Sequence, residues 1–165
     1  MKRFILCSLL ILPLALSAQK IKSGSLAFLK EEKSLNIVFD VSKARMIGSS
    51  NESESMVIPL WNADSTLLIK RFYYGVKDEM EKRYFLYGDV PEANYKAVFH
   101  IQQVGNDGTV YSLVEFSPNN GDEILCTVEM IGNGGRFGTF LNLFGDGLEE
   151  LGEAMGKLLK KNTRK

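Results

Sequence analysis

The feature that most constrains the fold is a long apolar stripe near the carboxyl end of the chain. In the segment LFGDGLEELGEAMGKLLKK, large apolar residues recur every three or four positions, which is the period of one helix face. The segment therefore predicts an amphipathic helix over about residues 143–161, which must bury its stripe against another layer of structure. The stripe consists of Phe144, Leu148, Leu151, Met155, Leu158 and Leu159.

The preceding segments predict that layer. Four runs rich in β-branched and aromatic residues predict strands. The sequence GNDG at 105–108 and the sequence SPNNGDE at 117–123 have the composition of tight turns, so we expect these strands to be sequential and antiparallel. The four runs span 84–90, 94–104, 109–117 and 123–132.

The first part of the mature chain predicts one helix between strands. Residues 33–42 alternate as a strand does, and a shorter strand is expected at Ser25–Lys30. A polar loop is expected at 48–56. The next segment has apolar residues at helical spacing up to Tyr84, with Asp64 or Ser65 as the expected N-cap.

These elements predict an α+β fold. We expect a mainly antiparallel sheet of about five strands, with an internal helix and a C-terminal amphipathic helix packed on it. A strand–helix–strand start would add one parallel pair to this sheet. Gly152 and Gly156 lie one turn apart in the last helix and predict a close approach to the sheet.

The N-terminus has the layout of a secretory signal peptide. The basic start MKR precedes the uncharged run FILCSLLILPLAL and the small residues of SAQK. Cleavage after Ser17 or Ala18 would leave one domain over 19–165, exported to the periplasm or envelope of a Gram-negative bacterium, with no transmembrane segment. Cys7 lies inside the apolar run, which disfavours lipidation.

Composition disfavours several kinds of partner. The chain has 20 basic and 20 acidic residues, so nucleic acid is not an expected partner. One His and 2 Cys form no metal-ligand pattern, and neither a metal nor a cofactor is expected. In the mature chain Cys126 is the one remaining cysteine, and its strand-like context EILCTVEM predicts a buried, inert thiol.

Catalytic motifs are weak. His100 lies in the strand-like run AVFHIQQV, and no G-x-S-x-G sequence accompanies it. Carboxylates at predicted strand ends are Asp40 and Asp89. A small hydrolase using Asp40, Asp89 or His100 is therefore an alternative to a non-enzymatic protein, and a small-ligand carrier with an apolar cavity between helix and sheet is another.

The glycine-rich stretch MIGNGGRFGTFLNLFGDG at 130–147 resembles a phosphate-binding loop in composition only. Its glycines match neither the dinucleotide fingerprint nor the P-loop spacing, so we interpret the stretch as the connector from the sheet to the last helix. Gly134, Gly135 and Arg136 remain binding candidates, Arg136 as a contact for an anion. Trp61 is a candidate either for core packing or for a surface anchor.

Basic and aromatic residues alternate in KRFYYG at 70–75 and in KRYFLYG at 82–88. This mixture can bind single-stranded nucleic acid by base stacking. The spacing is that of a helix packed on a strand, and export disfavours nucleic acid. We therefore expect these residues to pack in the core.

Three segments resemble a family of small exported proteins of unknown function from Bacteroides-type bacteria. They are KSLNIVFDVSKARMIG, ANYKAVFHIQQV and LNLFGDGLEELGEAMGKLLKK, and this chain departs from the family in a shorter middle region. The layout is also similar to curli-secretion-type and TolB-amino-terminal-type α/β envelope domains. The resemblance implies a protein that binds or assembles and offers no catalytic residues. We therefore expect an envelope-associated module that contacts another envelope protein, its oligomeric state being left open.

Overall fold

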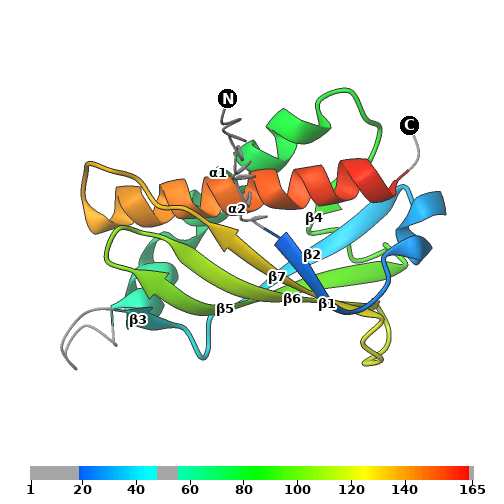
Figure 1. The fold of residues 1–165 in the computed structure, drawn as a ribbon, viewed down its shortest axis with the longest axis horizontal. Coiled ribbons are helices and arrows are strands. Elements are labelled where there is room, and N and C mark those ends of the chain that lie inside the picture. Colours follow the sequence, from blue (N-terminus) through cyan, green and yellow to red (C-terminus); the bar gives the residue numbers. More distant parts are fainter. Residues whose placement is uncertain (1–18, 48–55, 164–165) are drawn as a thin grey trace, which may run out of the picture.

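The computed structural model describes residues 19–47 and 56–163, which form an α+β domain (Figure 1). The predicted signal peptide and residues 48–55 of the predicted loop lie outside the described residues. In chain order the elements are β1 (Gln19–Gly24), the 3-10 helix η1 (Ala27–Glu31), β2 (Ser34–Asp40), β3 (Arg45–Ile47), α1 (Val57–Met80), β4 (Leu86–Gly88), β5 (Tyr95–Gly105), β6 (Val110–Pro118), β7 (Cys126–Gly132) and α2 (Phe140–Asn162).

The sheet is mixed, and the prediction of a mainly antiparallel sheet of about five strands is correct only in part. Within the described residues it has 7 strands, in the order β1-β7-β6-β5-β2-β4, with β3 also paired to β5. The pairs among β1, β7, β6 and β5 are antiparallel, whereas β2 runs parallel to both β4 and β5. The crossover through α1 explains the difference, because a strand that follows such a crossover can pair in parallel with the strand before it.

The two predicted turns are confirmed. The first joins β5 to β6, and the N–H of Gly105 donates to the carbonyl of Thr109 over 2.8 Å. Gly108 has a φ of 82°, a conformation that glycine adopts at little cost. The second turn joins β6 to β7. By contrast, β4 does not continue this antiparallel series as predicted, since it pairs with β2.

The prediction for the first strand is wrong. Ser25–Lys30 was expected to be extended, but Ala27–Glu31 forms η1 instead. Leu26 and Leu29 are both buried, and their i, i+3 spacing suits a helical turn better than a strand. The first strand is β1, whose residues are mostly exposed and therefore show no apolar alternation.

The internal helix begins earlier than predicted. It starts at Val57, and Asp64, one of the two expected N-caps, is a non-helical residue inside it, with φ −127° and ψ 17°. The first part forms because Val57 and Trp61, one turn apart, are both buried. Pro59 is tolerated there because the first turn of a helix needs no intrahelical N–H.

The C-terminal helix and its apolar stripe are confirmed, since every residue of the stripe is buried. The side chain of Thr139 caps the helix by accepting from the N–H of Asn142 at 3.4 Å. The expected approach of Gly152 and Gly156 to the sheet is wrong. Both face α1, and a Cβ at Gly152 would overlap the carbonyl oxygen of Phe72.

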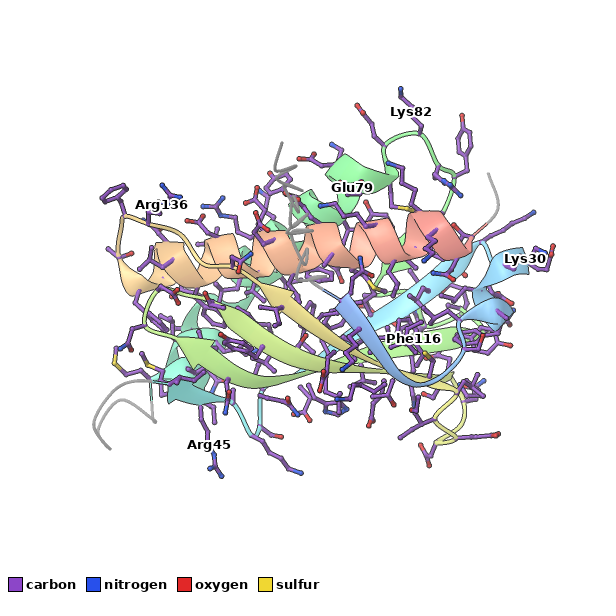
Figure 2. The ribbon with its side chains drawn as sticks, viewed as in Figure 1. Lys30, Arg45, Glu79, Lys82, Phe116 and Arg136 are labelled. Carbon is purple, nitrogen blue, oxygen red and sulfur yellow. The ribbon has the colours of Figure 1, made fainter. Side chains whose placement is uncertain are left out.

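Both helices lie on one side of the sheet, with α2 running along the length of the domain (Figure 1). The rings of Phe39, Phe72 and Phe99 join α1 to the central strands, with centroids 4.9 to 5.3 Å apart. Phe116 of β6 is also fully buried, whereas Arg45 projects from the opposite side of the sheet (Figure 2). The sheet therefore has one face covered by helices and one outer face.

Candidate functional site

A groove between α1 and the edge strand β4 is the first candidate site. We call it the tyrosine groove, and its cavity has a volume of about 610 Å³. Cavities of this size accommodate a small molecule or a few large side chains. Its lining residues are Thr66, Ile69, Lys70, Tyr73, Tyr74, Lys77 and Tyr87.

Helical spacing brings these side chains together. Thr66, Lys70, Tyr73 and Lys77 follow each other at three- and four-residue intervals, which places them along one side of α1. From β4, Tyr87 faces them, and its ring centroid lies 6.1 Å from that of Tyr73.

Glycine suits position 88 because of its backbone conformation. Its φ is 125°, which favours glycine, whereas a Cβ there would make an ordinary contact 3.4 Å from the ring of Tyr73. The sequence expectation that this aromatic segment packs in the core is thus confirmed for Phe72 and Phe85, which are buried. It is wrong for Tyr74, which is 47% exposed, and for Tyr84, which is fully exposed.

The rim of the groove is cationic. Lys70 places its ammonium 5.7 Å from the ring centroid of Tyr74, within the range of a cation–π interaction. Lys70 and Lys77 are exposed, and neither forms an ion pair with any residue that the structure describes. The two lysines therefore offer cationic contacts to an anionic occupant, while Asp89 is the carboxylate that acts on Tyr73 in the floor of the groove.

The floor of the groove is uncharged at physiological pH. Burial, with further contributions from Asp89 and Tyr87, raises the pKa of Tyr73 from 10.0 to about 12. Burial also raises the pKa of Tyr87. Both rings therefore carry neutral hydroxyls, which can donate or accept hydrogen bonds while the ring faces provide apolar contact.

A polar cluster on the outer face of the sheet is the second candidate. Here His100 of β5 lies between two carboxylates: its Nδ1 is 2.9 Å from Asp40 Oδ2, and its Nε2 is 3.2 Å from Glu115 Oε2. We call these three residues the outer cluster. It lines a cleft of about 640 Å³, which Lys43 and Arg45 also line.

The outer cluster is suited to charge pairing more than to catalysis. Both ring nitrogens of His100 contact carboxylates, and ionised carboxylates can only accept hydrogen bonds. Both nitrogens are thus engaged by side chains of the cluster itself. Among the described residues that line the cleft, none carries a hydroxyl or thiol nucleophile. Hydrogen bonds from the side chain and backbone of Ser42, with His100, lower the pKa of Asp40 from 3.8 to about 2.

The three residues of the hydrolase alternative do not converge. Asp40 and His100 meet in the outer cluster, but Asp89 follows β4, near Tyr73 and apart from that cleft. Cys126 is fully buried, and burial raises the pKa of its thiol.

Trp61 lies in the core. Its ring contacts those of Phe39 and Phe144, with centroids 5.5 and 6.4 Å apart, and the residue is 8% exposed. This placement corresponds to the core-packing alternative for Trp61, because the buried ring is not available as a surface anchor.

The glycine-rich connector is tightly packed. The N–H of Gly134 donates to Thr109 Oγ1 at 3.2 Å, and a Cβ on Gly134 would overlap the carbonyl oxygen of Asp107. A Cβ on Gly135 would overlap a carboxylate oxygen of Asp146. Arg136 projects from this connector into solvent (Figure 2) and lines neither candidate site.

Sequence reasoning missed Glu115 and the tyrosine groove. The pairing of β5 with β6 shifts register between Ile101 and Gln103, and this shift puts His100 opposite Leu113 and so within diagonal reach of Glu115. Regular counting outward from the turn at 105–108 would have put Val114 opposite His100, so the turn alone does not predict the contact with Glu115. The groove gave no signal either, because it depends on the pairing of β4 with β2.

Within residues 19–47 and 56–163, no three His, Cys, Asp or Glu side chains form a group that could hold a metal ion. Over the same residues, no helix is long and apolar enough to cross a membrane.

Comparisons with known proteins give only distant structural likenesses. No family model and no curated protein matches the sequence. The PelC dodecamer from Paraburkholderia phytofirmans is similar at 9% identity and a TM-score of 0.44, covering 89% of this chain and 98% of that one. A variant PelC dodecamer from the same species is similar at 10% identity and a TM-score of 0.38, covering 83% and 95%. Both TM-scores lie below 0.5, so the likeness assigns the chain neither a fold family nor a function.

Proposed function

We propose that this protein is an exported, non-enzymatic module of the cell envelope that binds another envelope protein through the tyrosine groove. The observation that carries the proposal is the groove itself, in which tyrosine rings lie beside two lysines that have no carboxylate partner among the described residues. Tyrosine is enriched among the residues that dominate binding energy at protein interfaces, because its ring gives contact area and its hydroxyl gives hydrogen bonds.

The two sheet edges are less suited to docking. At one end of the sheet, β1 carries Lys20 and Lys22, and lysines on an edge strand oppose pairing with another strand. At the other end, β4 has only 3 residues. A partner would gain few main-chain hydrogen bonds from either edge, so side-chain contacts in the groove provide the better surface.

Site-specific cross-linking tests the docking surface. A photoreactive residue at Tyr74 is expected to give one defined adduct in envelope fractions, since Tyr74 is exposed at the groove. The matched position is Lys161, which is exposed on α2 outside the groove and is expected to give none. Monomer alone at both positions, or equal adducts from both, would contradict the proposal.

Export is tested separately by the mass of the protein in each cell fraction. The signal-peptide layout of the N-terminal sequence supports a mature chain that begins after Ser17 or Ala18. We expect this processed form in the periplasm or envelope. An unprocessed chain in the cytoplasm would contradict export and would leave the cross-linking result to be explained by a cytoplasmic partner.

A small hydrolase is the alternative that a specific observation favours, namely the 2.9 Å contact between Asp40 and His100. It would have to use water as the nucleophile and release one nitrogen of His100 from its carboxylate. A hydrolytic activity that His100→Gln abolishes, in a variant with unchanged stability, would establish this alternative.

A small-ligand carrier is the remaining alternative, because the volume of the tyrosine groove also suits a small molecule. Native mass spectrometry of the purified protein distinguishes it. A retained small molecule that is lost on substitution of Tyr73 would favour the carrier over the docking module.

A further inference from the structure

We propose that the occupant of the tyrosine groove is an acidic amphipathic helix of the partner protein, lying alongside α1. This inference rests on the docking function proposed above and names the chemistry of the segment that docks.

The rim favours two carboxylates at a defined spacing. Lys70 and Lys77 lie two helical turns apart, and seven residues at 1.5 Å each give a separation of about 10 Å along the axis of α1. Acidic residues seven apart on a second helix have the same separation. A helix that runs beside α1 can therefore bring one carboxylate to each lysine.

The floor favours apolar side chains between those carboxylates. Tyr73 and Tyr74 lie between the two lysines in sequence, and Tyr87 and Ile69 add further apolar surface to the lining. The cavity of about 610 Å³ is too small for a whole helix but takes a few large side chains. Residues at positions i+3 and i+4 of the partner helix lie between acids at i and i+7 on the same face, and they would fill the cavity.

An extended segment fits this place less well. A docked strand gains affinity from main-chain pairing with a free sheet edge. The strand β4 has 3 residues and ends at Gly88, whose φ of 125° departs from extended geometry. Because pairing with β4 would be confined to so short a segment, a helix anchored by its side chains is the better match.

Peptide binding to the full mature protein tests the inference. The probe is a synthetic helical peptide with Glu at i and i+7 and with Leu and Phe at i+3 and i+4. A second peptide has Lys in place of both Glu. We expect the Glu peptide to bind the wild type, and to bind Lys70→Glu/Lys77→Glu about tenfold more weakly or worse. The Lys peptide should show the reverse preference.

The control variant Lys30→Glu/Lys161→Glu makes the same change of charge outside both candidate sites and should bind the Glu peptide as the wild type does. Absence of Glu-peptide binding, or equal binding by the groove variant, would overturn the inference. Binding of anionic phospholipid vesicles in place of the Glu peptide would also overturn it, in favour of a lipid surface. A cross-link from Tyr74 to a non-acidic or extended segment would refute the acidic helix while leaving the docking function intact.

Discussion

Replacement by alanine should change the stability of the protein in opposite directions at two glycines of α2, because only at one of them would the added Cβ meet the backbone of α1. In α2, a Cβ at Gly152 would overlap the carbonyl oxygen of Phe72, and across the contact a Cβ at Gly75 would overlap the carbonyl oxygen of Glu149. The backbones of α1 and α2 therefore meet at this point. By contrast, a Cβ at Gly145 would lie 3.5 Å from side-chain atoms of Arg71, which is ordinary contact.

The magnitudes follow from two terms. Replacing glycine by alanine inside a helix gains about 1 kcal/mol of helix propensity, and this gain is the same at both positions. At Gly152 the helices must also separate, and overpacking of this kind costs about 1–3 kcal/mol, or more when the obstacle is backbone. Because the obstacle at Gly152 is backbone, the overpacking cost lies at about 3 kcal/mol or above, and the propensity gain offsets about 1 kcal/mol of it. We expect Gly145→Ala to stabilise the protein by up to about 1 kcal/mol, and Gly152→Ala to destabilise it by about 2 kcal/mol or more.

Urea denaturation of the two variants and the wild type measures both effects, provided that the free energy of unfolding falls with urea concentration at the same slope in all three proteins. The pair is informative because both substitutions replace a buried glycine of α2 by alanine and differ only in what the added Cβ would meet. If Gly152→Ala proved as stable as Gly145→Ala, the two helices would not be in backbone contact, and the packing of α1 on α2 described above would be wrong.

Three further predictions follow from single contacts. Gly134→Ala should lower the melting temperature because its Cβ would overlap the carbonyl of Asp107. Added nucleotide should change the melting temperature of neither the wild type nor this variant, and a nucleotide-dependent change would support a phosphate-binding loop. Tyr73→Phe should remove the most alkaline phenolate step in a spectrophotometric titration of the folded protein, near pH 12; persistence of that step would assign it to another tyrosine. Because its folded pKa is lowered from 3.8 to about 2, Asp40 contributes stability that is present above about pH 4 and lost as the pH falls to about 2. Asp40→Asn should therefore cost stability at pH 6 but not at pH 2, by at most about 1 kcal/mol because the carboxylate is 36% exposed and screened by solvent; an equal cost at both pH values would refute this.

Local pattern was sufficient to predict the elements that have one apolar face. The C-terminal helix and the β5–β6–β7 series have strong periodicity and turn residues that admit few alternatives, and the structure confirms them. The exposed strand β1 has no such periodicity, since backbone pairing with β7 is what holds it extended. Its existence could not be inferred from side-chain pattern.

The parallel pairs mark the limit of the sequence prediction. Whether β4 pairs with β5 or with β2 depends on how the crossover through α1 packs, and that packing is set by rings distant in sequence, such as Phe39 and Phe72. Both candidate sites depend on it. Asp40 reaches His100 because β2 lies beside β5 in parallel register, and Tyr87 reaches Tyr73 because β4 lies beside β2.

We propose the tyrosine groove, and not the outer cluster, as the docking surface. The direct measurement is the affinity of the cross-linked partner, once purified, for the wild type, for a groove variant (Tyr74→Ala/Lys77→Ala) and for an outer-cluster variant (His100→Gln) of matched stability. We expect the groove variant to bind about tenfold more weakly or worse and the outer-cluster variant to bind as the wild type does. Wild-type affinity in the groove variant, together with a loss in the outer-cluster variant, would contradict the proposal.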